Sequence, residues 1–90
     1  MGKEVPGMEL ELYQMEGCPY CAKVRKKFSE LGISFTAHNP RQNDDRMEEL
    51  LELGGQDQVP FLVVRDGEGE VVETMYESDD IVAWLKNEFG

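Results

Sequence analysis

Apolar and polar residues alternate from Glu9 until a turn begins at Gly17, a pattern that predicts a first strand. Residues 18–31 change to apolar positions every three or four residues, which predicts a helix. Pro19 suits the first position of that helix, and Gly32 supplies its stop. The alternation runs through Leu10, Leu12 and Met15, and the apolar residues that share one face of the helix are Cys21, Val24, Phe28 and Leu31.

The rest of the pattern predicts three more strands and two more helices. Residues 66–69, Asp-Gly-Glu-Gly, are a hairpin signal between the last two strands. Asp45 and Glu48 resemble a capping box of the second helix, and Ser78 is expected to cap the last helix. The predicted strands are 33–37, 61–64 and 71–75, and the inward-facing helical residues are Met47, Leu50, Leu51, Gly54, Val82, Leu85 and Phe89. The element order is therefore β-α-β-α-β-β-α, an α/β domain.

The length of 90 residues fits one domain, which we expect at 9–90 after a flexible N-terminal extension at 1–8. The longest apolar run, 59–64, is far shorter than the roughly 20 residues of a membrane-spanning helix. No basic and apolar leader opens the chain. We therefore expect a cytoplasmic monomer that does not act at a membrane.

Nineteen acidic and nine basic residues give the chain a formal net charge of −10. This charge repels phosphate backbones, so nucleic acid is not expected as a partner. Four of the basic residues nevertheless lie close together in the first predicted helix, namely Lys23, Arg25, Lys26 and Lys27. Two interpretations are open: they add positive potential beside the cysteines, or they form a solvated helix face.

Cys18 and Cys21 carry the clearest chemical signal. They enclose Pro19 and Tyr20 between a predicted strand and a predicted helix, a context typical of a redox dithiol. Unpaired N–H groups at a helix start stabilise a thiolate, which favours Cys18 as the nucleophile. Cys21 lies one turn later on the apolar face, so it is expected to stay protonated and to resolve a mixed disulfide at Cys18.

Two other roles of the cysteines are weaker interpretations. A zinc site needs four ligands, and Cys18 and Cys21 find only His38 as a further strong one, so a carboxylate would have to complete it. We therefore expect no metal. A purely structural disulfide would close a loop of four residues and constrain the unfolded chain very little.

Four segments together resemble a glutaredoxin over residues 9–90. They are Glu-Leu-Glu-Leu-Tyr at 9–13, Cys-Pro-Tyr-Cys at 18–21, Val-Pro at 59–60 and Ser-Asp-Asp at 78–80. The resemblance implies a thioredoxin-like fold with a central four-stranded mixed sheet. It also implies a glutathione-disulfide oxidoreductase that reduces protein disulfides and mixed disulfides, with no bound cofactor and with glutathione or another γ-glutamyl thiol as cosubstrate.

The same resemblance implies roles for residues around the dithiol. Pro19, Tyr20 and Pro60 would support the active site, with Pro60 in a cis bond, and the Val59 backbone would pair with the cysteinyl group of glutathione. Ser78 and Asp79 at a helix start suit the carboxylate and the ammonium of a γ-glutamyl group, although simple helix capping also explains them. The expected thiol-binding residues are Tyr20, Val59, Glu77, Ser78 and Asp79.

Two departures from the glutaredoxin pattern leave the thiol cosubstrate open. Met15 stands where those proteins usually carry a lysine for a glutathione carboxylate, and Tyr76-Glu77 replaces a Gly-Gly pair. Glu77-Ser78 is similar instead to the first domain of glutathione transferases, where such residues bind the γ-glutamyl group. Residues that could replace the lysine are Arg41, Gln42 and Arg46. The thiol is accordingly glutathione, a shorter γ-glutamyl thiol, or none.

Two alternative functions use the same cysteines. In the first, Cys18 from two chains holds an iron-sulfur cluster or a metal for transfer. In the second, the protein is a thioredoxin-like electron donor that a flavoprotein reductase keeps reduced.

Overall fold

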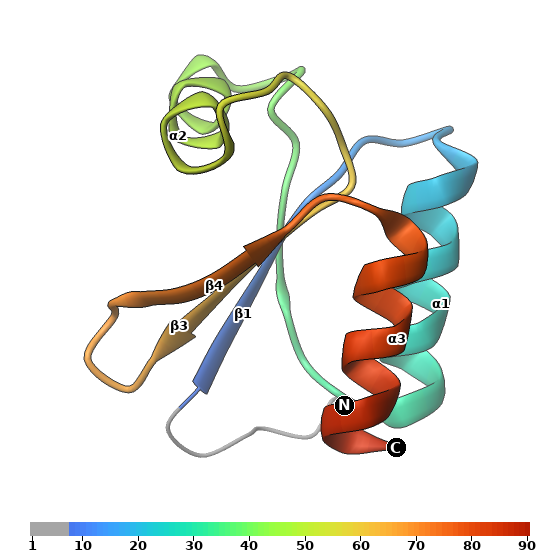
Figure 1. Ribbon diagram of the computed structural model, residues 1–90. Coiled ribbons are helices and arrows are strands. Elements are labelled where there is room, and N and C mark those ends of the chain that lie inside the picture. Colours follow the sequence, from blue (N-terminus) through green and yellow to red (C-terminus); the bar gives the residue numbers. More distant parts are fainter. Residues whose placement is uncertain (1–7) are drawn as a thin grey trace.

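The computed structural model describes residues 8–90 (Figure 1). Of the extension expected at 1–8, residues 1–7 lie outside the described residues, and the expectation is wrong for Met8, which is already the first residue of a strand. The strands are β1 (Met8–Tyr13), β2 (Thr36–His38), β3 (Phe61–Asp66) and β4 (Val71–Met75), and the helices are α1 (Pro19–Leu31), α2 (Asp44–Gly54) and α3 (Ser78–Phe89). The predicted order β-α-β-α-β-β-α is confirmed.

The four strands form one mixed sheet in the order β2-β1-β3-β4. β2 runs parallel to β1, while β3 is antiparallel to β1 and to β4. In this register Tyr13 lies opposite Phe61, and Leu62 lies opposite Met75. The ends of β1 and β4 and the beginning of β3 therefore meet at one edge of the sheet, and the loops that leave this edge build the site described below.

Helices cover both faces of the sheet, α1 and α3 side by side on one face and α2 on the other (Figure 1). The α1/α3 face buries the larger core, whose residues are Leu10, Leu12, Val24, Phe28, Ile33, Leu62, Val64, Ile81 and Leu85. The α2 face buries Tyr13, Leu50, Phe61 and Val63. β3 contributes to both cores because it is a central strand and four consecutive residues, 61–64, are buried.

Ionisable side chains are packed between the sheet and α2. Glu11 of β1 accepts a hydrogen bond from Arg65 of β3, and its Oε1 lies 2.8 Å from Nε2 of His38 on β2. The hydroxyl of Tyr13 donates to Glu49 of α2, and burial together with this carboxylate raises the pKa of Tyr13 far above its ordinary value. These contacts connect three strands to α2.

Tyr76, between β4 and α3, fastens the end of α2. Its ring packs against Phe61, with the ring centroids 4.5 Å apart. Its hydroxyl donates to the Gln56 carbonyl oxygen at 2.8 Å and accepts the Gln56 N–H at 3.1 Å. The ring also lies where a Cβ on Gly54 would be. The loop that leads from α2 to β3 is thereby held against the sheet.

Four local expectations are wrong. The second strand begins at Thr36 and not at Ile33, because the Ile33 N–H is used at the end of α1, where it donates to the Phe28 carbonyl. A capping box at Asp45 does not start α2, since the Asn43 side chain accepts the N–H groups of Asp45 and Arg46 at 3.0 and 3.3 Å.

The other two concern one residue in α2 and one in α3. Leu51 is 44% exposed, on the outer side of α2. Ser78 is the first residue of α3 and is buried, while Glu77 stands at the cap position without a side-chain capping bond. Within residues 8–90, every helix is too short or too polar to pass through a lipid bilayer.

Candidate functional site

The dithiol lies at the start of α1, which the sequence positions through two backbone features. Gly17 takes a positive φ of 80°, a conformation that favours glycine, and turns the chain from β1 into the helix. Pro19 occupies the first turn, where the missing N–H costs no hydrogen bond. Cys18 is thus the N-cap residue, and its Sγ accepts the backbone N–H of Cys21 at 3.4 Å.

The surroundings of the two sulfur atoms separate their acidities. Burial opposes ionisation of Cys18, but hydrogen bonds from the Cys21 thiol and from backbone N–H groups at the helix start outweigh it. The positive charge of Arg25 acts in the same direction, and the pKa of Cys18 is held below its ordinary value. Cys21 is fully buried, and burial together with its hydrogen bond to Cys18 raises its pKa to about 11.

The second segment of the site, after the loop that carries the cysteines, is the turn before β3. The Val59–Pro60 peptide bond is cis, as the resemblance implies. Pro60 is buried and Val59 is partly buried. Because Phe61 lies opposite Tyr13, this turn shares the edge of the sheet with the Cys18 loop, so the structure brings both predicted segments to one place. Tyr20 is 63% exposed at the same end of α1.

The third segment of the site is the start of α3, where Glu77, Ser78 and Asp79 follow β4. Figure 1 shows that α1 and α3 begin at the same end of the molecule. A salt bridge joins Lys23 of α1 to Asp79, which fixes this proximity. Glu77 and Asp79 are exposed, whereas Ser78 is buried. Carboxylates and helix N–H groups therefore lie at the same end of the molecule as the dithiol, an arrangement that suits an ammonium and a carboxylate.

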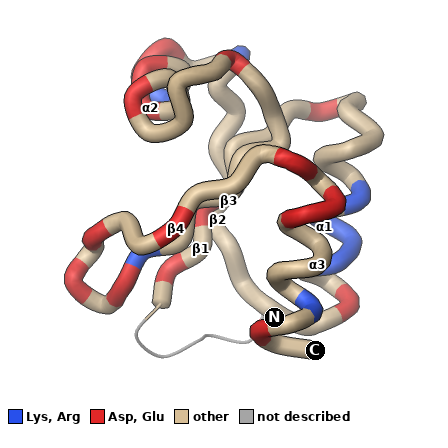
Figure 2. Tube along the Cα trace, in the orientation of Figure 1, with Lys and Arg blue, Asp and Glu red and all other residues tan. Residues whose placement is uncertain are grey.

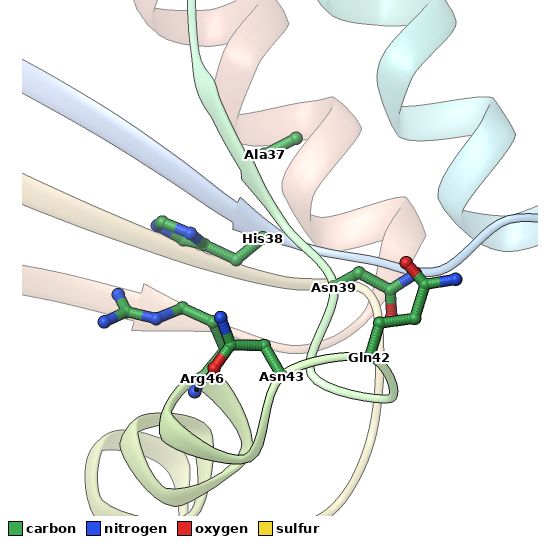
Figure 3. A pocket seen from close by; sticks show the side chains of 6 residues that line it. All are labelled: Ala37, His38, Asn39, Gln42, Asn43 and Arg46. Carbon is green, nitrogen blue, oxygen red and sulfur yellow. Dashed lines mark hydrogen bonds between the residues drawn. The ribbon is translucent and has the colours of Figure 1, made fainter.

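Met15, at the position of the missing lysine, lies beside the dithiol, because its backbone makes a hydrogen bond that lowers the pKa of Cys21. Gln42 and Arg46 line a hollow of about 480 Å³ between the end of β2 and the start of α2 (Figure 3). Arg41 is paired with Asp57 at 3.1 Å. The three proposed replacements for the lysine are thus spread over this hollow and its rim, and Arg46 is further held by Glu49 at 3.1 Å.

The zinc interpretation required His38 and a carboxylate to join Cys18 and Cys21 within one chain. Across residues 8–90, no three His, Cys, Asp or Glu side chains gather closely enough to hold a metal ion. The His38 side chain is directed to Glu11 in the layer under α2.

Sequence reasoning missed two contacts of the site, the salt bridge between Lys23 and Asp79 and the hydrogen bond from Arg25 to Gln14 in the loop before Cys18. The sequence offers Arg25 only as one member of a basic group, and nothing in it pairs this residue with Gln14. The bond keeps the Arg25 guanidinium beside the loop of the dithiol. Its positive charge helps to lower the pKa of Cys18 and acts against the rise in the pKa of Cys21.

The fold and the dithiol together define a protein of the glutaredoxin and thioredoxin fold. The profile of the family "Glutathione S-transferase, N-terminal domain" matches residues 12–90, and the chain belongs to this family. Glutaredoxin 3 of Escherichia coli (strain K12) is 31% identical over 55 residues, which are 61% of this chain and 66% of that protein. The match thus spans slightly less than two thirds of this relative.

Solved structures share the fold at lower identity. Maleylacetoacetate isomerase from Anaeromyxobacter dehalogenans, solved with bound glutathione in its active site, matches with a TM-score of 0.70 and 20% identity. The match covers 94% of this chain and 39% of the isomerase. Oxidised thioredoxin from Plasmodium falciparum matches over the whole of both chains with a TM-score of 0.63 and 14% identity.

Proposed function

We propose that the protein is a thiol-disulfide oxidoreductase of the glutaredoxin type, which reduces protein disulfides and mixed disulfides with glutathione or a similar γ-glutamyl thiol. The observation that carries this proposal is the unequal placement of two neighbouring thiols. The Cys18 sulfur accepts an N–H at the start of α1, while the Cys21 sulfur is fully buried one turn below. In such a pair, one thiolate attacks the substrate disulfide, and the other thiol resolves the mixed disulfide that forms.

In the proposed reaction the Cys18 thiolate attacks one sulfur of the substrate disulfide. A bond forms between Cys18 and that sulfur, and the other substrate sulfur leaves as a thiolate and takes a proton from water. Cys21 then loses its proton and attacks the Cys18 sulfur. This step forms the Cys18–Cys21 disulfide and releases the second substrate thiolate, so the substrate gains the two electrons that the dithiol loses.

Two molecules of a small thiol regenerate the dithiol. The first opens the Cys18–Cys21 disulfide and becomes a mixed disulfide with Cys18, and the second releases the first as the oxidised thiol. We assign the γ-glutamyl end of this thiol to Glu77, Ser78 and Asp79 and its cysteinyl backbone to Val59, beside Tyr20. Glutathione is bound in the active site of the Anaeromyxobacter isomerase, a protein of the same fold, and this supports a γ-glutamyl thiol as the cosubstrate.

The test compares Cys18→Ser with Cys21→Ser in two assays, turnover of a small mixed disulfide with glutathione and reduction of a protein disulfide. Cys18→Ser should lose both activities. Cys21→Ser should retain the first, because glutathione from solution resolves the intermediate, and should lose reduction of those protein disulfides that need an internal second thiol. Activity remaining in Cys18→Ser would contradict the proposal.

A second assay identifies the physiological reductant. Oxidised protein is incubated with glutathione in one sample and with a thioredoxin reductase in another, and the free thiols are counted. Reduction by glutathione supports the proposal, whereas reduction by the flavoprotein alone would replace it with the thioredoxin-like donor.

A further inference from the structure

Helix α1 is the positive part of a strongly negative protein. It carries four basic residues and one acid, a formal charge of +3, in a chain with a net charge of −10. Figure 2 shows the basic segments following one another along α1, while acidic segments mark α2, the β3–β4 hairpin and the start of α3. We call the four residues Lys23, Arg25, Lys26 and Lys27 the basic face of α1.

Part of this charge is not neutralised within the described chain. Lys23 pairs with Asp79, and Lys27 pairs with Glu30 at 3.0 Å. Arg25 bonds to the uncharged amide of Gln14, and in residues 8–90 neither Arg25 nor Lys26 forms an ion pair within 4.0 Å. Lys26 is exposed, and positive charge is thereby presented to solvent on the outer side of α1.

The basic face begins next to the reactive sulfur. Cys18 caps the helix, and Lys26 follows eight residues later, about 12 Å along the helix axis at 1.5 Å per residue. A bound extended chain covers roughly 13 Å in four residues. An acidic residue three or four positions from a disulfide held at Cys18 therefore comes within reach of Lys26.

We propose that the basic face of α1 is a docking surface for substrate proteins that carry acidic residues three to four positions from their disulfide. This inference rests on the proposed function and names the class of protein disulfide that the site prefers. The negative remainder of the molecule repels such a segment from every other approach, so electrostatic steering delivers the disulfide to Cys18.

Two other negatively charged occupants fit less well. A nucleic acid extends far beyond one helix and meets the acidic segments that mark the rest of the molecule (Figure 2). A second copy of this chain would bring a further charge of −10 against the first. A short acidic segment that runs from the disulfide along the outer side of α1 meets the basic face and is too short to reach α2 and the β3–β4 hairpin.

The experiment uses two peptides that contain the same internal disulfide. One carries Glu at the third and fourth positions on each side of the disulfide, and the other carries Gln there. The wild-type protein should reduce the acidic peptide with about tenfold higher kcat/KM at low ionic strength. At 1 M salt, where the Debye length is roughly 3 Å, the preference should disappear.

Two matched variants separate the basic face from the net charge. Lys26→Glu should abolish the preference for the acidic peptide. Lys86→Glu makes the same change of charge at an exposed position in the last turn of α3 and should keep the preference. Equal loss in both variants would mean that only the net charge matters and would overturn the inference.

The inference and the proposed function fail in different ways. Equal reduction of both peptides overturns the docking surface and leaves the oxidoreductase intact, whereas failure to reduce either peptide overturns the oxidoreductase. A binding measurement then decides the docking surface without redox chemistry. A cysteine-free acidic peptide should shift the backbone amide NMR signals of residues 23–27. Three results would overturn the docking surface: no shifts with the peptide, equal shifts with an oligonucleotide, or shifts that depend on protein concentration alone.

Discussion

Replacing Glu11 by Gln should destabilise the protein at neutral pH through the layer under α2. The Glu11 side chain is only 16% exposed and accepts from both His38 and Arg65. Hydrogen bonds to charged groups contribute about 1.5 to 3 kcal/mol each. Gln keeps one acceptor oxygen, but its amide group brings a donor toward partners that also donate. We therefore expect the free energy of unfolding to fall by about 2 kcal/mol, the contribution of one such hydrogen bond.

The loss should also depend on pH in a defined direction. Burial raises the pKa of Glu11, but the hydrogen bonds from His38 and Arg65 and the charge of Arg65 outweigh it, and the pKa lies below its ordinary value. A lowered pKa means that the ionised carboxylate stabilises the fold above the pKa of the unfolded chain. This contribution disappears as the pH falls through the folded pKa. The free energies of unfolding of wild type and Glu11→Gln should therefore converge in acid.

Urea denaturation at several pH values measures this effect. With slopes of about 1 to 3 kcal/mol per molar urea, a loss of about 2 kcal/mol should lower the midpoint at pH 7 by roughly 0.7 to 2 M. Glu52→Gln, which removes an exposed carboxylate of α2, is the matched control and should change the midpoint little. A difference between wild type and Glu11→Gln that stays constant down to acid pH would refute the reasoning.

Three further changes test the site and α2. Met15→Lys should lower the KM for a glutathione mixed disulfide at low salt, because a lysine beside the dithiol offers a carboxylate contact of at most ~1.5 to 3 kcal/mol; unchanged turnover would remove residue 15 from the site. The double change Glu77→Ala with Ser78→Ala should weaken binding of a γ-glutamyl thiol in calorimetry, and full binding would reduce both residues to helix structure. Leu50→Ala should lower the unfolding free energy measured in urea by about 2 to 5 kcal/mol, since the Leu50 side chain of α2 is fully buried in the core between this helix and the sheet.

Local signals in the sequence were sufficient for the order of elements and for the dithiol. The alternation before Gly17 and the apolar spacing from Cys21 to Leu31 depend on neighbours in the chain, and the structure places β1 and α1 accordingly. The resemblance to glutaredoxins supplied the Val59-Pro60 turn and the start of α3. The register of β1 with β3 explains why these distant segments share one edge of the sheet.

Contacts between distant residues escaped prediction because nothing local marks them. Glu11 meets His38 and Arg65 across 27 and 54 positions of the chain. The cap of α2 was misassigned because Asp45 and Asn43 are both good capping residues, and only backbone geometry decides between them. Ile33 has the composition of a strand residue, but its N–H is needed to close the end of α1.

The contacts of Tyr76 with Gly54 and Gln56 also restrict which sequences this domain tolerates. Any side chain on Gly54 would collide with the phenol ring of Tyr76, so a larger residue at 54 requires a smaller one at 76. That exchange would remove both hydrogen bonds to Gln56, four positions before Pro60. Related chains should therefore vary at 54 and 76 together. An engineer who changes Tyr76, just before α3, must also redesign the end of α2.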